Sequence, residues 1–573
     1  MAMKCIRRLV LLGGLALVAA CSIGGSPVSP ATPDPRFHWF AYEGNDSVFK
    51  ERATGPDDYV NPVLAGFYPD PSIVRVGDDY YLVNSTFAYF PGVPIFQSRD
   101  LVHWTQIGNV LDRPSQLNLA GADISRGIYA PTIRYHAGTF YMITTLVDKG
   151  GSFFVTATNP AGPWSEPNWL PSVDGIDPSF YFDDDGKAYV VNHGETIDAP
   201  QWDGHRAIWL QEFDVASQQM VGPRQLIVNG GVDLTTKPIW IEGPHIFKKD
   251  GHYFLICAEG GTGDQHSEVV FRSDFVWGPY VAGPVNPSLT QRHLDPTRAF
   301  PVTSTGHADF VQTQHGEWWA VFLGTRPYDG DMYNTGRETF LLPVRWENGW
   351  PVITSGDERV SYVHKRPTLP ASPATSEPYG GNVRYRDDFS AGRLSSQWLF
   401  IRTPTEKWYE IGGASNSLML RARSVDFAPG GQPSFLGRRQ QNTNASVSTE
   451  MSYAPAKEGD KAGLVAFQND EFYYFLAVAR VDGRTVVQVE KHAGPPAQGD
   501  HDVAASAVLT TGENAPVFLR ITARGARYDF YYGTQAGEWR LLLGDADGTI
   551  LSTKVAGGFV GSLFGLYAYT PGS

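Results

Sequence analysis

The stretch Gly66-Phe67-Tyr68-Pro69-Asp70-Pro71-Ser72-Ile73 opens a pattern that recurs along the first two thirds of the chain. Its tail is a short lead, usually X-Pro-Ser/Thr followed by an aliphatic or aromatic residue. A few polar positions, a small turn that usually contains glycine, and an aromatic-rich alternating strand come after the lead. Five copies are recognisable, with leads at residues 70–73, 130–133, 177–180, 243–246 and 307–310.

The spacing of the copies predicts the fold. Successive turn glycines are separated by 61, 48, 65 and 65 residues, counted from Gly77 through Gly138, Gly186, Gly251 and Gly316. Periods of this size built from hairpins are typical of β-propeller blades rather than of helical solenoids. We therefore predict a five-bladed β-propeller over residues 60–365, in which each copy forms the inner hairpin of a four-stranded blade.

Propeller symmetry also predicts which residues meet. Because equivalent leads should lie at one height on the central axis, the residues that open the five copies should converge on one end of the pore. These residues are Asp70, Tyr129 or Ala130, Asp177, Glu242 and His307. Three carboxylates and a histidine would then share one site although they are far apart in sequence.

Length and composition agree with a two-domain, strand-rich protein. A chain of 573 residues is too long for one compact domain. The 61 Gly, 41 Pro and 13% aromatic residues favour short strands joined by turns, and aromatic faces suit carbohydrate. The net charge of -14 argues against nucleic acid as a partner, and three cysteines are too few for a metal cluster or a disulfide framework.

The five-copy pattern stops before residue 384. A Pro-rich linker is predicted over residues 366–383. Alternating stretches such as residues 463–469 and 473–479, without helical periodicity, then predict an antiparallel β-sandwich of concanavalin or jelly-roll type over residues 384–573. The whole chain is thus expected to be all-β.

The N-terminus has the pattern of an export signal. Basic residues precede an apolar run at residues 9–20 that is too short to span a bilayer, so residues 1–20 are a predicted signal peptide. The run ends Leu17-Val18-Ala19-Ala20-Cys21-Ser22, which is similar to a bacterial lipobox and predicts lipidation of Cys21. We expect an anchor in the outer membrane of a Gram-negative cell, facing an undetermined side, with ordinary secretion as the alternative. Residues 21–59 are then the lipidated cysteine, a flexible tether to about residue 36 and an extension, residues 37–58, with no predicted role.

The gathered carboxylates fit glycosidic bond hydrolysis. One carboxylic acid must protonate the leaving oxygen while a second carboxylate activates water or attacks the sugar, so their pKa values must differ. We predict Asp70 as base and Glu242 as acid, with Trp240 and Ile241 giving Glu242 an apolar setting. Asp177 would keep the acid protonated by like-charge repulsion. The alternative is that X-Asp-Pro-Ser is simply a turn.

Two further residues are candidates for binding. His307 is expected near the axis beneath the carboxylates, acting through water or a cation, or else as a structural residue. Arg337, in Gly336-Arg337-Glu338-Thr339, would pair with a carboxylate or hold a sugar hydroxyl, and a structural ion pair is its alternative.

At these residues the chain resembles the family 43 glycoside hydrolases, particularly their β-xylosidases with a C-terminal sandwich. The matching segments are residues 66–72, 85–93, 98–104, 127–135, 176–180, 241–245, 306–309, 336–339 and, downstream, 435–441. The resemblance implies an inverting single displacement with Asp70 as base, Glu242 as acid and Asp177 as pKa modulator. Inversion needs room for water, so the two reacting carboxyl groups should be roughly 6.5–9.5 Å apart.

The same resemblance implies a substrate site. Phe87 and Tyr129 would wall the first sugar subsite, Arg337 would bind sugar hydroxyls, and His307 would lie beneath the sugar, where a calcium ion is part of the implied arrangement. Tyr129 departs from the family pattern, since many relatives carry Trp there. Phe559, in Gly557-Gly558-Phe559-Val560-Gly561, would close the site from the sandwich or else belong to the sandwich core.

The leading hypothesis is an exo-acting β-xylosidase on xylo-oligosaccharides or arabinoxylan fragments that requires no cofactor. An α-L-arabinofuranosidase or a bifunctional enzyme is the nearest alternative, because the two sugars present similar hydroxyl geometry. A non-catalytic sugar-binding lipoprotein and a retaining enzyme of the fructan-acting type are more distant alternatives. The oligomeric state is left open, with a homo-oligomer among the options.

Overall fold

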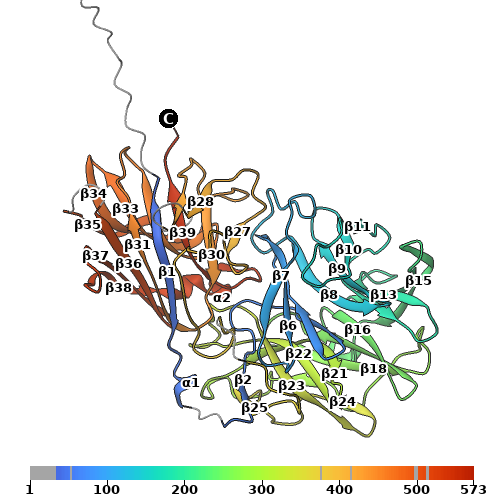
Figure 1. The fold of residues 1–573 in the computed structure, drawn as a ribbon. Coiled ribbons are helices and arrows are strands. Elements are labelled where there is room, and N and C mark those ends of the chain that lie inside the picture. The colour runs from blue at the N-terminus through green and yellow to red at the C-terminus, as the bar shows by residue number, and fades with distance from the viewer. Residues whose placement is uncertain are drawn as a thin grey trace, which may run out of the picture.

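The computed structural model describes residues 34–51, 55–373, 377–412, 416–495, 501–510 and 515–572. The predicted signal peptide and Cys21 lie outside the described residues. A propeller occupies the blue-to-yellow part of the ribbon, and a sandwich occupies mainly its orange-to-red part (Figure 1). The predicted all-β class, a five-bladed propeller followed by a sandwich, is confirmed.

The propeller consists of five antiparallel sheets, each formed by strands that follow one another along the chain except that blade I leaves out β5. Blade I contains β3 (Ser72–Val76), β4 (Asp79–Val83), β6 (Gly92–Ser98) and β7 (Thr105–Leu111). Blade II contains β8 (Ile128–His136), β9 (Thr139–Leu146), β10 (Gly151–Ala157) and β11 (Asn168–Trp169). Blade III contains β12 (Ile176–Phe182), β13 (Ala188–Gly194), β14 (Ala207–Asp214) and β15 (Gln219–Asn229). Blade IV contains β16 (Glu242–Lys249), β17 (His252–Glu259), β18 (Ser267–Ser273), β19 (Val281–Ala282) and β20 (Leu289–Thr290). Blade V contains β21 (Thr303–Gln312), β22 (Trp318–Thr325), β23 (Glu338–Glu347) and β24 (Trp350–Val352).

The first strands of the blades contact one another in a closed ring, β3 to β8 to β12 to β16 to β21 and back to β3. The segment before β3 ties blade I to blade V. Leu64 forms a bridge with Thr339, and the Asn61 side chain bonds both the N–H and the C=O of Leu341, at 2.9 and 2.8 Å. A short sheet of β2 (Asp58–Val60) and β25 (Val363–Lys365) lies beside this closure. The ring brings the starts of all five inner strands to one end of the axis.

Two eight-stranded sheets form the sandwich. The first has β26 (Arg384–Asp387) beside β1 (Arg36–Gly44), within the order β28 (Tyr409–Gly412), β29 (Ser417–Leu420), β1, β31 (Asn444–Ser452), β36 (Pro516–Arg524), β37 (Arg527–Gly533) and β38 (Arg540–Asp547). The second has the order β35 (His501–Val508), β34 (Arg484–Ala493), β33 (Phe472–Val481), β32 (Lys461–Asn469), β39 (Leu563–Tyr569), β30 (Ser434–Arg439), β27 (Leu399–Ile401) and β5 (Tyr89–Phe90). Alternate residues of β31, such as Val447 and Met451, are buried between the sheets, as expected for a strand with one buried face.

Two segments from the N-terminal part of the chain contribute to the sandwich. β1, which falls mostly in the extension with no predicted role, pairs with β26, β29 and β31 inside the first sheet. β5 leaves blade I and pairs with β27 at the edge of the second sheet. The sequence pattern missed both strands because β1 lies far from its partners along the chain and β5 has only two residues.

The two bodies share buried contacts. The Arg439 guanidinium from β30 donates to the Phe67 carbonyl at 2.7 Å and packs over the rings of Phe67 and Tyr68. Arg326, from the propeller, pairs with Asp46 and Glu338 and is almost fully buried. A buried arginine is stable only where its donors are satisfied, so the relative position of the two bodies depends on these partners.

Helical segments are short. They comprise α1 (Val48–Glu51), η1 (Leu234–Thr236), η2 (Gly548–Leu551) and α2 (Thr553–Ala556). In the described ranges no helix has the length and apolar character needed to cross a bilayer.

Candidate active site

Every inner strand begins with the same kink. The first residue of each lead has a left-handed backbone, with φ of 53° at Asp70, 29° at Ala130, 52° at Asp177, 56° at Gly243 and 54° at His307. In blades II to V the pairing register shifts around this residue. Such bulges bend a strand and re-aim its side chains, and left-handed conformations of non-glycine residues collect at functional sites. The kinks therefore mark the axial end of the propeller as the candidate site.

The kink agrees with the predicted lead at residues 243–246 and shows where Glu242 stands relative to it. The residue of blade IV that corresponds to Asp70 and Asp177 is Gly243, and Glu242 comes one position earlier, where blade II has Tyr129. A β-carbon on Gly243 would lie 2.8 Å from Nε2 of His307. Because the imidazole fills that space, blade IV carries its carboxylate on the preceding residue.

Asp70 is buried and held by three neighbours. Its Oδ2 accepts from the Ser85 hydroxyl at 2.6 Å, its Oδ1 accepts from Arg337 at 3.1 Å, and His307 Nδ1 lies 3.8 Å from Oδ1. Burial by itself raises the pKa of Asp70, but Arg337, His307 and the Ser85 hydroxyl outweigh burial and lower the pKa below its ordinary value. Asp70 is therefore ionised at neutral pH.

Asp177 and Glu242 are shifted the other way. Asp177 is 4% exposed and accepts from the Gly243 N–H at 3.1 Å. Burial raises the pKa of Asp177 to about 6, with the Asp70 carboxylate adding to the rise and His307 opposing it. Burial, then Asp177 and Asp70, raise the pKa of Glu242 well above its ordinary value, although the side chain keeps some exposure. At neutral pH the site thus holds two ionised carboxylates, Asp70 and for the most part Asp177, and one protonated carboxylic acid, Glu242.

An aromatic wall lies beside Asp70. The Phe87 ring is 5.5 Å from Tyr129 and 6.2 Å from Phe559, while Arg337 packs 5.8 Å from Phe87 and 5.7 Å from Phe559. Tyr129 is half-buried and donates its hydroxyl hydrogen to the Ser125 carbonyl. Arg337 Nε is buried and has no hydrogen-bond partner within the described residues. The wall therefore presents aromatic faces together with one unused N–H.

Phe559 reaches this wall from the sandwich. It follows α2 in a loop where Gly557 and Gly558 have φ of 73° and 79°. The Phe559 N–H donates to the Ser125 hydroxyl at 2.9 Å, and a β-carbon on Gly558 would lie 2.1 Å from that same oxygen. Glycine at 558 is needed for this close approach, so the loop sequence places Phe559 at the propeller rather than inside the sandwich core.

A second polar layer lies below the carboxylates, two residues further along each inner strand. Asp309 accepts from the Ser72 hydroxyl at 2.7 Å and from Arg134 at 2.8 and 3.1 Å. Burial lowers the pKa of His245 to about 3, so its unprotonated Nδ1 can accept from Arg134 at 3.0 Å. These bonds join blades I, II, IV and V and hold the strand starts in place.

Sequence analysis missed several of these supporting residues. Ser85 and Arg134 stand inside segments that carry the family resemblance, but no repeat signal distinguishes them. Asp309 and His245 occupy the third position of their leads, where other copies have Ser or Thr. That break in the repeat was the available signal for the second layer.

Trp240 differs from its predicted surroundings. Ile241 is buried, whereas Trp240 is 36% exposed and Arg206 packs 4.4 Å from its ring. The backbone N–H of Trp240 donates to the Gly204 carbonyl. Its indole, partly exposed and packed against Arg206, therefore does not give Glu242 the apolar setting that was predicted.

The described residues offer no preformed set of metal ligands. In the parts of the chain that the structure describes, no three His, Cys, Asp or Glu side chains converge as a group that could hold an ion. Calcium takes six to eight oxygen ligands, and His307 faces Asp70 and Gly243. The calcium ion expected near His307 stays a prediction.

Comparison with known proteins places the chain in a family. The model of "Glycosyl hydrolases family 43" matches residues 59–351, and the model of "Beta xylosidase C-terminal Concanavalin A-like domain" matches residues 386–573. The fold and paired carboxylates are those of a glycoside hydrolase, and the chain belongs to glycosyl hydrolase family 43, whose mechanism is inverting. The predicted resemblance is confirmed.

Similar proteins match along most of their length. A xylosidase/arabinosidase of Butyrivibrio fibrisolvens is 41% identical over 515 residues, which cover 89% of this chain and 96% of that protein. A non-reducing end α-L-arabinofuranosidase of Bacteroides ovatus is 39% identical over 513 residues, covering 89% and 90%. The crystal structure of a GH43_12 protein from a capybara gut metagenome has a TM-score of 0.87 at 41% identity and covers 94% of this chain and 100% of that one.

Proposed function

We propose that this protein is an exo-acting β-xylosidase that releases xylose from xylo-oligosaccharides with inversion of configuration. One observation carries the proposal: Asp70 is kept ionised and Glu242 protonated at the same end of the propeller axis. These are the opposite states that inverting hydrolysis requires of its base and its acid.

Each group has one task in the reaction. Asp70 takes a proton from water as the water oxygen bonds to the anomeric carbon. Glu242 gives its proton to the glycosidic oxygen as the bond between that oxygen and the anomeric carbon breaks. Asp177, beside the Gly243 N–H, keeps the pKa of Glu242 high through its negative charge.

Arg337 and the aromatic wall would hold the sugar. The free Arg337 Nε–H can donate to a sugar hydroxyl while another guanidinium nitrogen keeps Asp70 ionised. Phe87, Tyr129 and Phe559 enclose that side. A first subsite walled by aromatic rings on that side fits removal of a terminal residue rather than cleavage inside a chain.

An α-L-arabinofuranosidase, alone or combined with the xylosidase, is the second candidate. It is supported by the name of the Bacteroides ovatus relative and by the dual name of the Butyrivibrio fibrisolvens relative. Tyr129, whose hydroxyl is tied to Ser125, lies where the two sugars would contact the wall.

The test measures hydrolysis of two substrates and the anomeric configuration of the product. Hydrolysis rates on 4-nitrophenyl β-D-xylopyranoside and 4-nitrophenyl α-L-arabinofuranoside give the balance of the two activities. Proton NMR of the first-formed xylose should show the α-anomer. A first-formed β-anomer, or turnover of neither substrate by a chain that binds xylobiose, would contradict the proposal.

We also propose export and lipid anchoring through Cys21, supported by the apolar run and the residues 17–22 around the cysteine. Metabolic labelling with radioactive palmitate in a Gram-negative host should label the chain, and Cys21→Ala should abolish the label. Label that survives in the variant would exclude the anchor, and fractionation would then distinguish secretion from retention.

A further inference from the structure

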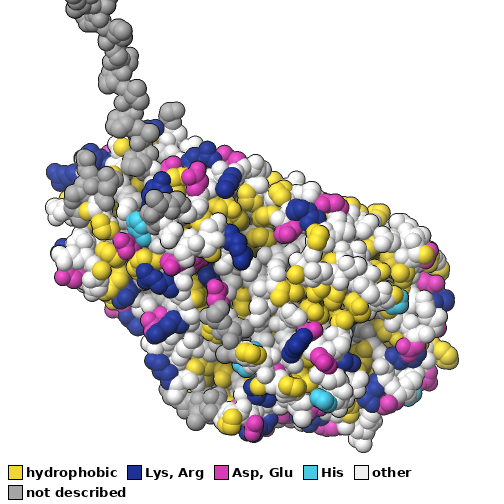
Figure 2. Space-filling view, viewed as in Figure 1, with side chains coloured by type: hydrophobic (Ala, Val, Ile, Leu, Met, Phe, Trp, Pro, Cys, Tyr) yellow, Lys and Arg dark blue, Asp and Glu magenta, His cyan; other side chains and the backbone are white. Residues whose placement is uncertain are grey.

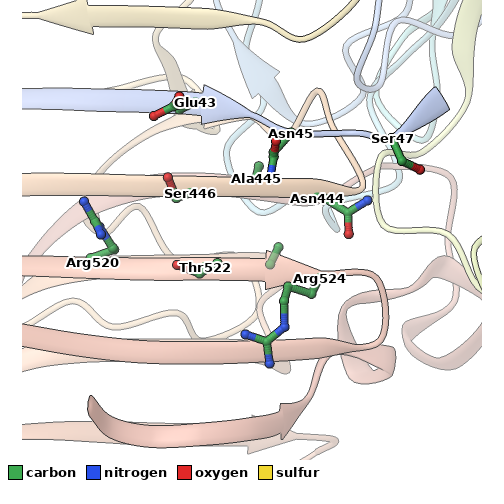
Figure 3. Close-up of a pocket in the computed structure, with 10 residues that line it drawn as sticks. Glu43, Asn45, Ser47, Asn444, Ala445, Ser446, Arg520, Thr522 and Arg524 are labelled. Carbon is green, nitrogen blue, oxygen red and sulfur yellow. The ribbon is translucent and has the colours of Figure 1, made fainter. Parts of the chain in front are cut away.

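The outward face of the first sandwich sheet carries a trough that no step of hydrolysis uses. Two adjoining hollows, of about 660 and 390 Å³, lie over β1, β31 and β36. Both are lined by Glu43, Ser446 and Arg520, so they form one continuous depression. Figure 3 shows the first hollow, with side chains from the three neighbouring strands on a common face.

Strand register explains the shape. On β31, Ala445 and Val447 are buried, while Ser446 and Ser448 face outward. Cross-strand pairs put Ser446 between Glu43 of β1 and Thr522 of β36, and Ser448 between Ala41 and Arg520. Small side chains therefore make the floor.

Long side chains make the walls of the trough. Arg384 and Arg386 of β26 stand on one side, opposite Glu43 and Ala41 in the register. Arg520 and Arg524 stand on the other, and Figure 3 shows Arg520 extending toward β31. Trp39 continues the first wall beside Glu450. The outward-facing rows from Ser446 to Glu450 span about 13 Å, at ~3.3 Å per residue.

Most charges on the walls are already paired. Arg384 pairs with Glu43, and Arg524 pairs with Asp529 and Asp545. Both signs are interspersed on the sandwich part of the molecular face in Figure 2. Without a surplus of positive charge, the trough does not suit a phosphate or a nucleic acid. A neutral ligand fits better.

Its free groups form hydrogen bonds. The hydroxyls of Ser446, Ser448 and Thr522 have no protein partner among the residues that the structure describes, and the Arg520 guanidinium has none either, although its Nε is buried. Two indole rings lie behind the wall arginines rather than in the lining, with Arg386 4.1 Å from the Trp39 ring and Arg520 4.1 Å from the Trp539 ring. Hydroxyls that donate and accept, together with guanidinium N–H donors, suit the hydroxyls of a sugar.

We infer that this trough is a second, non-catalytic carbohydrate site that binds a neutral stretch of xylan-type chain and keeps the enzyme on its polymer. The choice of xylan rests on the proposed function, whereas the existence of a carbohydrate site rests on the trough itself. A second copy of this chain is the rival occupant, and it is an outcome of the test.

The test uses the full-length chain. Native gels with and without soluble arabinoxylan measure retardation, in the presence of enough xylose to occupy the active site. Ser448→Tyr fills the trough, and Arg520→Ala removes its unused donor. Val508→Tyr is the matched control, because it introduces the same side chain at an exposed strand position of the opposite sheet.

We expect the wild type and Val508→Tyr to be retarded equally, and the two trough variants to lose at least about tenfold in apparent affinity. All four proteins should hydrolyse the aryl xyloside within about twofold of one another, which also shows that they are folded. Equal retardation of Ser448→Tyr and wild type overturns the inference, and so does a change in oligomeric state of that variant on size-exclusion chromatography. Failure to hydrolyse any glycoside would reject the proposed function instead, and retardation by arabinoxylan would still report on the trough.

Discussion

Gly243 and His307 are packed so closely that a β-carbon added to Gly243 would lie 2.8 Å from Nε2 and 3.0 Å from Cε1 of the imidazole. Through this contact, blade V dictates which residue of blade IV can carry a carboxylate. It also sets the Gly243 N–H against Asp177 and the imidazole against Asp70.

Gly243→Ala should therefore disrupt the site. The alanine must adopt φ of 56° and displace His307, so we expect kcat/KM to fall at least about 100-fold, since misplacement by 1 Å is costly in catalysis. Gly251→Ala is the matched control, because Gly251 also has positive φ, 82°, but a β-carbon there meets nothing within 4 Å. It should cost about 1 kcal/mol of stability with unchanged kcat. Comparable losses of activity in both variants would contradict this account.

The pH profile should be bell-shaped. Activity rises as Asp70 ionises, below its ordinary pKa, and falls as Glu242 ionises, well above its ordinary pKa. Asp177→Asn removes a negative charge that raises the pKa of Glu242, so the alkaline limb of kcat/KM should move to lower pH. Asp184→Asn, on an exposed turn of the same blade, should leave both limbs in place. An unmoved alkaline limb in Asp177→Asn would exclude the modulator role.

Arg337 should set the position of the acidic limb of the pH profile. It is the largest of the influences that lower the pKa of Asp70, so Arg337→Ala should move the acidic limb to higher pH and reduce kcat/KM at least about 100-fold. Arg337→Lys keeps a positive charge but presents a different donor geometry. Compared with Arg337→Ala, the Arg337→Lys variant should bring the acidic limb of the pH profile back toward its wild-type position more fully than it brings KM back. If the limb and KM recover equally, the arginine has a purely structural role.

Phe559 tests the contribution of the sandwich. Phe559→Ala removes a ring that contacts Phe87, Tyr129 and Arg337, and we expect kcat/KM to fall about 10- to 100-fold with little change in thermal unfolding. Phe275→Ala deletes a ring that is 68% exposed and should be silent. A loss of unfolding temperature that accounts for the loss of activity would instead mark Phe559 as a packing residue.

Trp240 is a candidate contact for the leaving group. In the proposed mechanism Glu242 protonates the leaving oxygen, so the next sugar would lie on that side of the site, and the partly exposed Trp240 indole belongs to a residue only two positions away along the chain. Trp240→Ala should lower kcat/KM about tenfold on xylotriose and less than twofold on the aryl xyloside. Trp169→Ala, at a tryptophan that is 43% exposed on blade II, should affect neither substrate. Equal losses on both substrates would place Trp240 in the chemistry rather than in recognition.

The sequence by itself determined the number of blades, the position of the carboxylates and the presence of the sandwich. The repeated lead and its spacing predicted five blades and the gathering of Asp70, Asp177 and Glu242, because rotational symmetry brings equivalent positions together whatever their separation in sequence. The alternating strands after residue 384 likewise predicted a sandwich, because a sheet with one buried face repeats every two residues.

Only the tertiary structure decided the details that break the repeat. It gave the reason why blade IV carries its carboxylate at Glu242, one residue before the lead, since the His307 ring fills the space beside Gly243. It put β1 inside the sandwich and Phe559 at the propeller, both through contacts between segments hundreds of residues apart. Local periodicity reports what each strand buries, whereas the partner that a strand or a loop meets depends on how the whole chain packs.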